Sequence, residues 1–114
     1  MAMEQNDYRD FFSTLANLSR MGIVQLLRRR GATVTQIAET LGYEQSRVSH
    51  SLARLQRAGI VVCRWEDKRK MFHLVDDVAP VLRDIETYLE RRPKPGKNGA
   101  ERGWSNTWAV ASSE

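Results

Sequence analysis

The residue types best suited to contact a partner lie between Tyr43 and Lys70. This segment carries seven cations and three anions, whereas residues 76–91 carry two cations and five anions. Short polar groups, which suit base edges, precede arginines and lysines, which suit phosphates. Positive charge is therefore concentrated on one part of the chain, and the pattern favours double-stranded DNA as the partner.

A helix that starts near Gln45 is expected to present the base-reading groups. Val48, Leu52 and Leu55 recur at helical spacing and would anchor one face, which leaves the opening turns exposed to a major groove. The predicted base-reading residues are Gln45, Ser46, Arg47, Ser49 and His50. A guanidinium such as that of Arg47 can pair with O6 and N7 of guanine, worth about 1–3 kcal/mol of discrimination, and a glutamine can pair with adenine.

Further cations follow along the chain, and they suit the sugar-phosphate backbone rather than the bases. The residues predicted to contact it are Arg54, Arg57, Arg64, Lys68, Arg69 and Lys70. The alternative is that this run of charge is only a solvated helix face and hairpin tip. Charge, expected geometry and side-chain type together favour DNA.

The elements that must position these residues follow from hydrophobic periodicity. A first helix from Tyr8, capped by Asn6 or Asp7, breaks near residues 17–19. A second helix ends in arginines followed by Gly31, which is expected to adopt a left-handed conformation. A third, short helix capped by Thr33 or Thr35 is followed after Gly42 by the helix 46–58. Two helices joined by a turn that contains glycine predict a helix-turn-helix.

The periodicity changes beyond Gly59. β-Branched and aromatic residues at 60–65 and apolar residues at 71–75 flank a polar tip, so they predict a β-hairpin, with Asp67 suited to a positive φ in the turn. A last helix begins at Asp76 or Asp77 and ends near residue 92. The fold class expected is mainly α with a small β-hairpin, a winged helix-turn-helix.

Chemistry other than recognition is not indicated. The sequence contains no Ser/His/Asp set, no glycine-rich phosphate loop and no evident pair of catalytic acids, so we expect neither an enzyme nor a cofactor. His50, His73 and Cys63 lack a compact metal-ligand spacing, so no metal is expected. We interpret Cys63 as a small buried hydrophobic residue and His73 as a structural or phosphate-facing residue of the wing.

Apolar residues on the first and last helices exceed what a small DNA-reading domain can cover. Such a surplus usually marks an interface, although part of it must complete the core of the monomer. We expect a homodimer. The predicted interface residues are Phe11, Phe12, Leu15, Val81, Ile85, Tyr88 and Leu89.

The order of three segments resembles the ArsR/SmtB family of dimeric winged-helix repressors. These are LSRMGIVQLL, TQIAETLGYEQSRVSHSLARLQRAGIV and RWEDKRKMFHL, and the resemblance spans about Phe11 to Leu89. It implies a symmetric dimer that binds an inverted-repeat operator and represses until an inducer weakens binding. It also implies that the first and last helices form the dimer interface. MarR-type regulators share the architecture.

The family's known inducers do not carry over to this sequence. Metal-sensing members often have Cys-Val-Cys in the first helix of the helix-turn-helix, where this chain has ATVTQIAETL. Other members bind zinc with Asp, His and Glu on the last helix, which here has no His. Redox-sensing members use two cysteines, and this chain has only Cys63. Asp67 replaces a frequent Gly, and Glu44 replaces a capping Ser. The inducer is left unassigned.

The 114 residues suggest one domain, residues 1–92, followed by a flexible tail, residues 93–114, rich in proline, glycine and charge. No apolar run is long enough for a membrane helix and no secretory signal is visible, so a cytoplasmic protein without a membrane partner is expected. A protein-interaction module that uses the apolar helices and the tail's Trp104 and Trp108 is the alternative function. A metal or thiol sensor would need ligands shared across a dimer.

Overall fold

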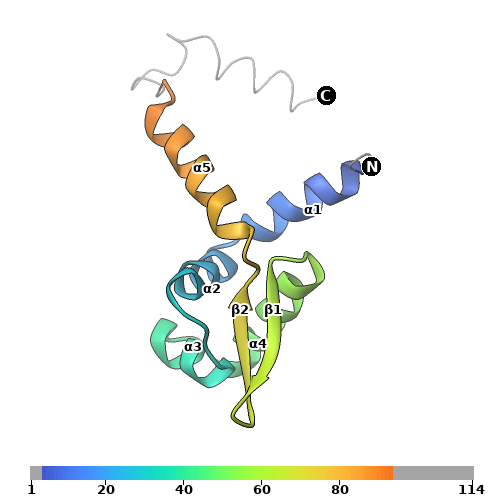
Figure 1. Ribbon diagram of the computed structural model, residues 1–114, viewed down its shortest axis with the longest axis vertical. Helices are drawn as coiled ribbons and strands as arrows, with labels where there is room; N and C mark the ends of the chain where they lie inside the picture. The colour runs from blue at the N-terminus through green and yellow to red at the C-terminus, as the bar shows by residue number, and fades with distance from the viewer. Residues whose placement is uncertain (1–3, 94–114) are drawn as a thin grey trace. The chain divides into compact units, whose positions relative to one another are not determined.

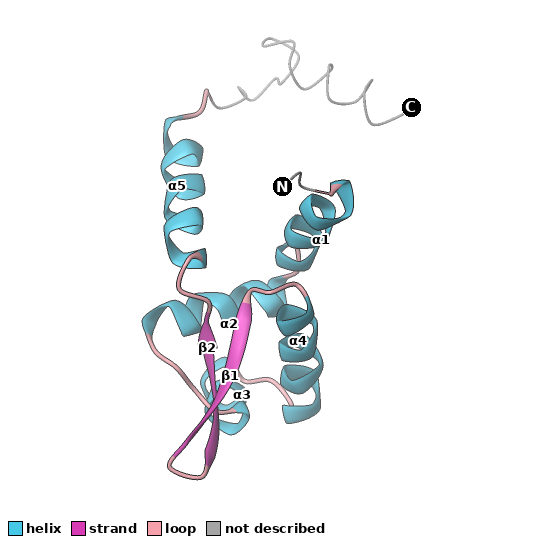
Figure 2. Cartoon of the chain, turned by 45° about the vertical axis from the view of Figure 1, so that its right-hand side comes forward, coloured by secondary structure: helices cyan, strands magenta, loops and turns pink. Residues whose placement is uncertain are grey.

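The structure is a computed structural model that describes residues 4–93, and the rest of the predicted tail lies outside this range. Five helices and one two-stranded sheet follow one another in the described part of the chain (Figures 1 and 2). They are α1 (Gln5–Leu15), α2 (Leu18–Arg29), α3 (Val34–Leu41), α4 (Gln45–Arg57), β1 (Val61–Glu66), β2 (Arg69–Leu74) and α5 (Val78–Arg91). The expected fold class is confirmed.

The chain divides into two compact units, residues 1–82 and 83–114, and the division falls within α5. The first unit holds every element from α1 to the first turn of α5. In the second unit, the described residues are the remainder of α5 and the residues that end it. No helix among residues 4–93 is long and apolar enough to cross a membrane.

The helix ends follow local capping chemistry. Asn17 separates α1 from α2 and is the N-cap of α2. Its side chain accepts a 3.0 Å hydrogen bond from the backbone N–H of Arg20. The expected cap of α1 by Asn6 or Asp7 is wrong. The helix begins after Glu4, whose side chain makes no capping hydrogen bond.

The helix-turn-helix has a well-capped first helix and a poorly capped second one. Thr33 and Gln36 form a reciprocal capping box at the start of α3, as expected for Thr33. Gly42 ends α3 with φ +73°, the left-handed conformation that glycine adopts without a steric penalty. Glu44 precedes α4 without a side-chain capping bond. The start of α4 therefore depends on other contacts.

The core is built by α2, α3, α4 and the base of the hairpin. Val48, Leu52 and Leu55 of α4 are almost completely buried, as the sequence predicted. They pack in one cluster with apolar residues of the other elements, among them Ile23 and Ile37. Because these side chains recur every three or four residues, only one face of α4 is committed to the core.

The hairpin pairs antiparallel from Val61 opposite Leu74 to Glu66 opposite Arg69. Its two-residue turn holds both Asp67 and Lys68 at positive φ, as a type I′ turn requires. The sequence predicted this for Asp67 only. Figure 2 shows the hairpin as a twisted ribbon whose tip projects beyond the helices.

The linker between α2 and α3 pairs with the hairpin instead of ending in a left-handed glycine. Ala32 and Phe72 exchange two backbone hydrogen bonds of 3.1 and 2.8 Å. The expected left-handed Gly31 is wrong, because α2 ends with Arg30 in extended backbone and Gly31 has no positive φ. The last helix starts at Val78, two residues after Asp76, and Val78 and Leu82 are buried.

Candidate nucleic-acid interface

Helix α4 exposes the whole predicted base-reading set. Gln45, Ser46, Arg47, Ser49 and His50 are all exposed, and Val48 between them is buried. This separation follows from the helical repeat, because the anchoring residues and the polar residues occupy different sides of the first two turns. The arrangement leaves the opening turns of α4 accessible to a partner.

Three members of that set have no partner within the described part of the chain. The side chains of Ser46, Ser49 and His50 make no hydrogen bond or ion pair with other residues of the range 4–93. Gln45 makes only a long hydrogen bond, in which its Nε2 donates to Oγ1 of Thr35 at 3.4 Å. These donors and acceptors are satisfied by water in the isolated protein and are available to base edges.

Arg47, in contrast, turns back onto the body of the protein. Its Nη2 donates to Oγ of Ser19, in the first turn of α2, at 2.5 Å. Its guanidinium carbon lies 4.2 Å from the ring centroid of Tyr43, a cation–π geometry. The side chain that the sequence made the strongest candidate for guanine is therefore engaged elsewhere in this structure.

Arg54 is engaged in a similar way. Its Nη2 lies 2.8 Å from Oδ1 of Asp10 on α1, and the two side chains are 26% and 45% exposed. This ion pair joins α4 to the first helix. A contact between Arg54 and a phosphate, as the sequence predicted, would have to compete with Asp10.

The remaining predicted backbone contacts are exposed cations on the end of α4 and along the hairpin. They are Arg57, Arg64, Lys68, Arg69 and Lys70. Lys70 lies over the Phe72 ring with its Nζ 5.8 Å from the centroid. Lys68 lies in the turn of the hairpin and Arg69 and Lys70 follow it at the start of β2, so these charges gather at the hairpin tip.

The structure adds a feature that the sequence analysis missed. An open hollow is lined by Arg69 and Lys70 of the hairpin and by the start of α3, residues 33–36. Thr33 and Thr35 bring hydroxyl groups to this hollow. The Thr-x-x-Gln capping signature locates the start of α3 in the sequence, but its approach to the wing follows only from the tertiary fold.

His73 and Cys63 lie at the base of the wing rather than at its tip. His73 Nε2 lies 2.7 Å from Oε2 of Glu66. Cys63 is a free thiol that is half-buried against the core, so it is less enclosed than expected. Among residues 4–93, no three His, Cys, Asp or Glu side chains are grouped so that they could hold a metal ion.

The predicted dimer residues differ in their accessibility. Leu15 is buried in the core, and Phe11 packs against it. Phe12 is 45% exposed on α1 and makes edge-to-face contacts with Tyr8 and Phe11. On α5, Val81, Tyr88 and Leu89 are exposed and Ile85 is half-buried. The sequence analysis missed Leu18, which is 90% exposed at the start of α2.

Comparison with known proteins gives consistent matches. Residues 18–62 match the family described as "Bacterial regulatory protein, arsR family". The chain is 32% identical over 84 residues to the HTH-type transcriptional regulator Rv0081 of Mycobacterium tuberculosis, which covers 72% of this chain and 74% of that one. It is 38% identical over 74 residues to NmtR of the same organism, covering 65% of this chain and 62% of NmtR.

Solved structures agree with these matches. The crystal structure of Rv0081 has a TM-score of 0.68 at 31% identity and covers 74% of this chain and 86% of that chain. HlyU from Vibrio cholerae has a TM-score of 0.65 at 25% identity and covers 79% of this chain and all of HlyU. Rv0081 and NmtR are both named as HTH-type transcriptional regulators, which is a class of regulator and not of enzyme. The chain belongs to the ArsR family of bacterial transcriptional regulators and has a winged helix-turn-helix fold.

Proposed function

We propose that the protein is a sequence-specific regulator that binds double-stranded DNA as a dimer and represses transcription from an inverted-repeat operator. The observation that carries this proposal is the opening of α4. The side chains of Ser46, Ser49 and His50 are exposed there and have no partner among residues 4–93, whereas the opposite side of the same turns is buried. A helix with one anchored face and one accessible polar face is what a major groove accepts.

Affinity comes from the cations beside that helix. Arg57, near the C-terminal end of α4, and Lys68, Arg69 and Lys70 at the hairpin tip are exposed. Each phosphate that such a side chain neutralises releases condensed counterions from DNA, so binding weakens as salt increases. In this proposal, α4 supplies the sequence preference and the wing supplies affinity that does not depend on sequence.

The dimer is proposed from exposed apolar side chains on α1 and α5. Phe12, Val81, Tyr88 and Leu89 are between 39% and 64% exposed, although they are large and apolar. A second copy of the chain would cover them. Two copies related by twofold symmetry would place their α4 helices about 34–36 Å apart, one turn of DNA, and would require a near-palindromic site.

Selection of bound DNA from a random pool tests the proposal. We expect an inverted repeat, and titration of the recovered site at several salt concentrations should give a slope of about −0.9 per phosphate contact in log K against log salt. Lys68→Ala should weaken all sequences equally, whereas Ser49→Ala or His50→Ala should relax the preference at one base pair in each half-site. Recovery of unrelated sequences with no salt dependence would contradict the proposal.

A regulator of this kind works where the DNA is, so the proposal places the protein in the cytoplasm. Residues 1–92 would carry both DNA reading and dimerisation, and residues 93–114 would form a separate tail. The predicted roles of Trp104 and Trp108 lie outside the described residues. If the wild-type protein binds no DNA, an interaction module becomes the better account of the exposed apolar helices.

A further inference from the structure

We propose that Arg47 and Arg54 are positioning residues, which hold α4 against α1 and α2, and that neither contacts DNA. The inference rests on the proposed function, because it concerns the helix that would enter the major groove. It reverses the role that residue type alone gives these two of the three arginines of α4, which is contact with a base or a phosphate.

The two arginines leave α4 between its buried face and the side that carries Ser46 and His50, and Arg47 is exposed there whereas Arg54 is half-buried. They are seven residues apart, two helical turns, so their side chains leave the helix in nearly the same direction. Ser51, which lies between them on that side, is buried. Arg57, by contrast, falls on the side that carries Ser46 and His50 and is exposed. The helix therefore has a core face, an exposed face and a flank occupied by Arg47 and Arg54.

Arg47 connects the first turn of α4, which has no side-chain cap, to neighbouring parts of the fold. Glu44, the residue before the helix, makes no side-chain capping bond, and glutamate is a poor N-cap. The Arg47 guanidinium instead connects the first turn to two neighbours. It lies over Tyr43, just before the helix, and donates to Ser19 of α2, which is only 7% exposed. The planar guanidinium suits both contacts at once, because its face stacks while its edge donates.

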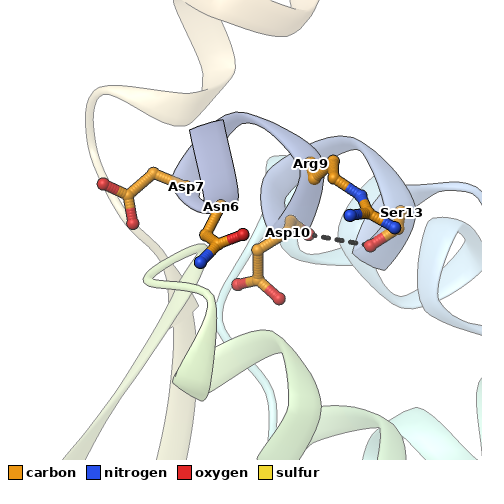
Figure 3. A pocket seen from close by; sticks show the side chains of 5 residues that line it. All are labelled: Asn6, Asp7, Arg9, Asp10 and Ser13. Atoms are coloured by element: carbon orange, nitrogen blue, oxygen red, sulfur yellow. Dashed lines mark hydrogen bonds between the residues drawn. The ribbon is translucent and has the colours of Figure 1, made fainter. Parts of the chain in front are cut away.

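Arg54 connects the C-terminal half of α4 to α1. Its partner Asp10 points from α1 towards α4, as Figure 3 shows. Asp10 is also part of the turn that receives hydrogen bonds from Ser13 and Thr14, whose hydroxyl groups donate to the Asp10 carbonyl oxygen at 3.3 and 2.6 Å. These two hydrogen bonds engage the backbone of Asp10, and its carboxylate pairs with Arg54.

Both contacts would have to be broken before either arginine could reach DNA. The guanidinium of Arg54 would exchange one anion, Asp10, for another, a phosphate, with little net gain. Arg47 would lose its stacking on Tyr43 and leave the Ser19 hydroxyl, which is almost buried, without its partner. The exposed wing cations Lys68 and Arg69 have no such contact with other described residues, so phosphate contact falls to them.

The ion pair joins α1, which is part of the proposed dimer interface, to α4, which is proposed to read the DNA bases. Asp10 lies on α1, which also carries the exposed Phe12, and its ion pair ends on α4. A shift of α1 would therefore act directly on the angle at which α4 meets the groove. The ion pair between Asp10 and Arg54 connects these two parts of the proposed machinery.

Titration of variants against the selected DNA site, at several salt concentrations and at 25 °C, tests the inference. Asp10→Asn and Arg54→Gln should each weaken binding by about fivefold or less, and the double variant should weaken it no further. The slope of log K against log salt should stay unchanged in all three. A slope smaller by about 0.9 in Arg54→Gln would show a phosphate contact and overturn the inference for Arg54.

The base preference recovered from a random pool tests Arg47. Arg47→Gln and Ser19→Ala should weaken every sequence alike and leave the preference intact, since both variants remove the same contact. Loss of preference at one base pair in Arg47→Gln, but not in Ser19→Ala, would show that Arg47 reads a base and would overturn the inference for Arg47.

Three controls complete the experiment. Asp10→Glu keeps the charge and should restore most of the affinity that Asp10→Asn loses, which simple destabilisation does not predict. Arg57→Gln removes a cation from the exposed side of α4 and should lower the salt slope by about 0.9. The melting temperature of each variant of Asp10, Arg54, Arg47 and Ser19 should shift by only about 2–4 °C, so that all proteins are folded during the titration.

The proposed function is tested by the wild-type protein, and the positioning role is tested by the variants. If the wild-type protein shows no salt-dependent binding to DNA, the proposed function falls and the positioning role falls with it. If the wild-type protein binds a palindrome but the variants show that Arg47 or Arg54 contacts DNA, the proposed function stands and this inference alone is overturned.

Discussion

At the scale of single residues, Gly31 shows how strongly one position can depend on a distant side chain. A Cβ built on Gly31 would overlap the imidazole of His73, which lies on β2. The backbone of Gly31 has no positive φ, so its conformation alone does not call for glycine. The requirement is steric, because the linker after α2 passes directly against the base of the wing.

Gly31→Ala is expected to lower the free energy of unfolding by about 1–3 kcal/mol, since the added methyl group forces His73 or the linker to move. Urea unfolding followed by circular dichroism measures this. In a His73→Ala background the same change should cost within about 0.5 kcal/mol, because the clash is gone. Equal costs in both backgrounds would contradict the assigned contact.

Gly22 provides a matched control. It lies in the middle of α2, and a Cβ there would make only ordinary contacts, 3.8 Å from Cδ1 of Leu41 and 4.0 Å from Oη of Tyr43. Gly22→Ala is therefore expected to stabilise the protein by about 0.5–1 kcal/mol, because alanine restricts the unfolded chain and favours helix. A loss of stability would mean that α2 is packed more tightly than these distances indicate.

At the scale of elements, α3 and α4 differ in how their first turns are stabilised. The Thr33 hydroxyl caps α3 and the Thr33 backbone N–H donates in return to Oε1 of Gln36, whereas Glu44 leaves α4 without a side-chain cap. The N-terminal N–H groups of α4 therefore face water, or a DNA phosphate in the proposed complex. The difference leads to opposite expectations for two substitutions.

Thr33→Ala should destabilise the protein by about 1 kcal/mol, and Glu44→Ser should stabilise it by about 0.5–1 kcal/mol, since serine is a good N-cap and glutamate is not. Both changes in stability are measured from the midpoints of urea unfolding, provided that the dependence of the unfolding free energy on urea concentration is the same in each variant. Gln36→Ala is the control for Thr33→Ala, because it removes only the returning bond of the capping box. Stabilisation of the same size by Glu44→Ala would show that charge, and not capping, is responsible.

The hairpin turn carries strain that its sequence does not relieve. Asp67 tolerates a positive φ, but Lys68 adopts φ +64° as well, a conformation unfavourable for a residue with a long side chain. Lys68→Gly is expected to stabilise the hairpin by about 1 kcal/mol, as judged by thermal unfolding. Since Lys68 is also a proposed phosphate contact, the same variant should bind DNA more weakly, and a gain in both properties would contradict that role.

At the scale of the whole molecule, oligomeric state decides whether the proposed function is possible. Phe12 on α1 and Tyr88 on α5 are 45% and 64% exposed. If a second copy covers these side chains, dimerisation is linked to folding by mass action, and the stability of the protein rises with its concentration.

Phe12→Glu and Tyr88→Glu are expected to convert a dimer to a monomer in sedimentation equilibrium, because each places a charge in the proposed apolar interface. The melting temperature of the wild-type protein should rise with concentration and that of the variants should not. Arg30→Glu, at an exposed polar position that ends α2, is the control and should leave the dimer intact. A monomeric wild-type protein would remove the basis for a palindromic operator.

Much of the fold was predictable because it rests on local patterns. The spacing of Val48, Leu52 and Leu55 defines the buried face of α4, and the Thr33 cap and Gly42 mark the ends of α3. Two local expectations were wrong, the cap of α1 and the left-handed Gly31. The latter is wrong because the linker pairs with β2 through Ala32, a contact that the sequence around Gly31 does not contain.

By itself, the sequence determined the order and type of the elements, the face of α4 that is buried, and the basic character of the wing, because periodicity and composition act over a few residues. Only the tertiary structure decided what the long polar side chains do. Arg47 reaches a partner 28 positions away and Arg54 one 44 positions away. A guanidinium has many rotamers and several possible partners, so its contact is chosen by which helices lie beside it and not by the residues next to it in the chain.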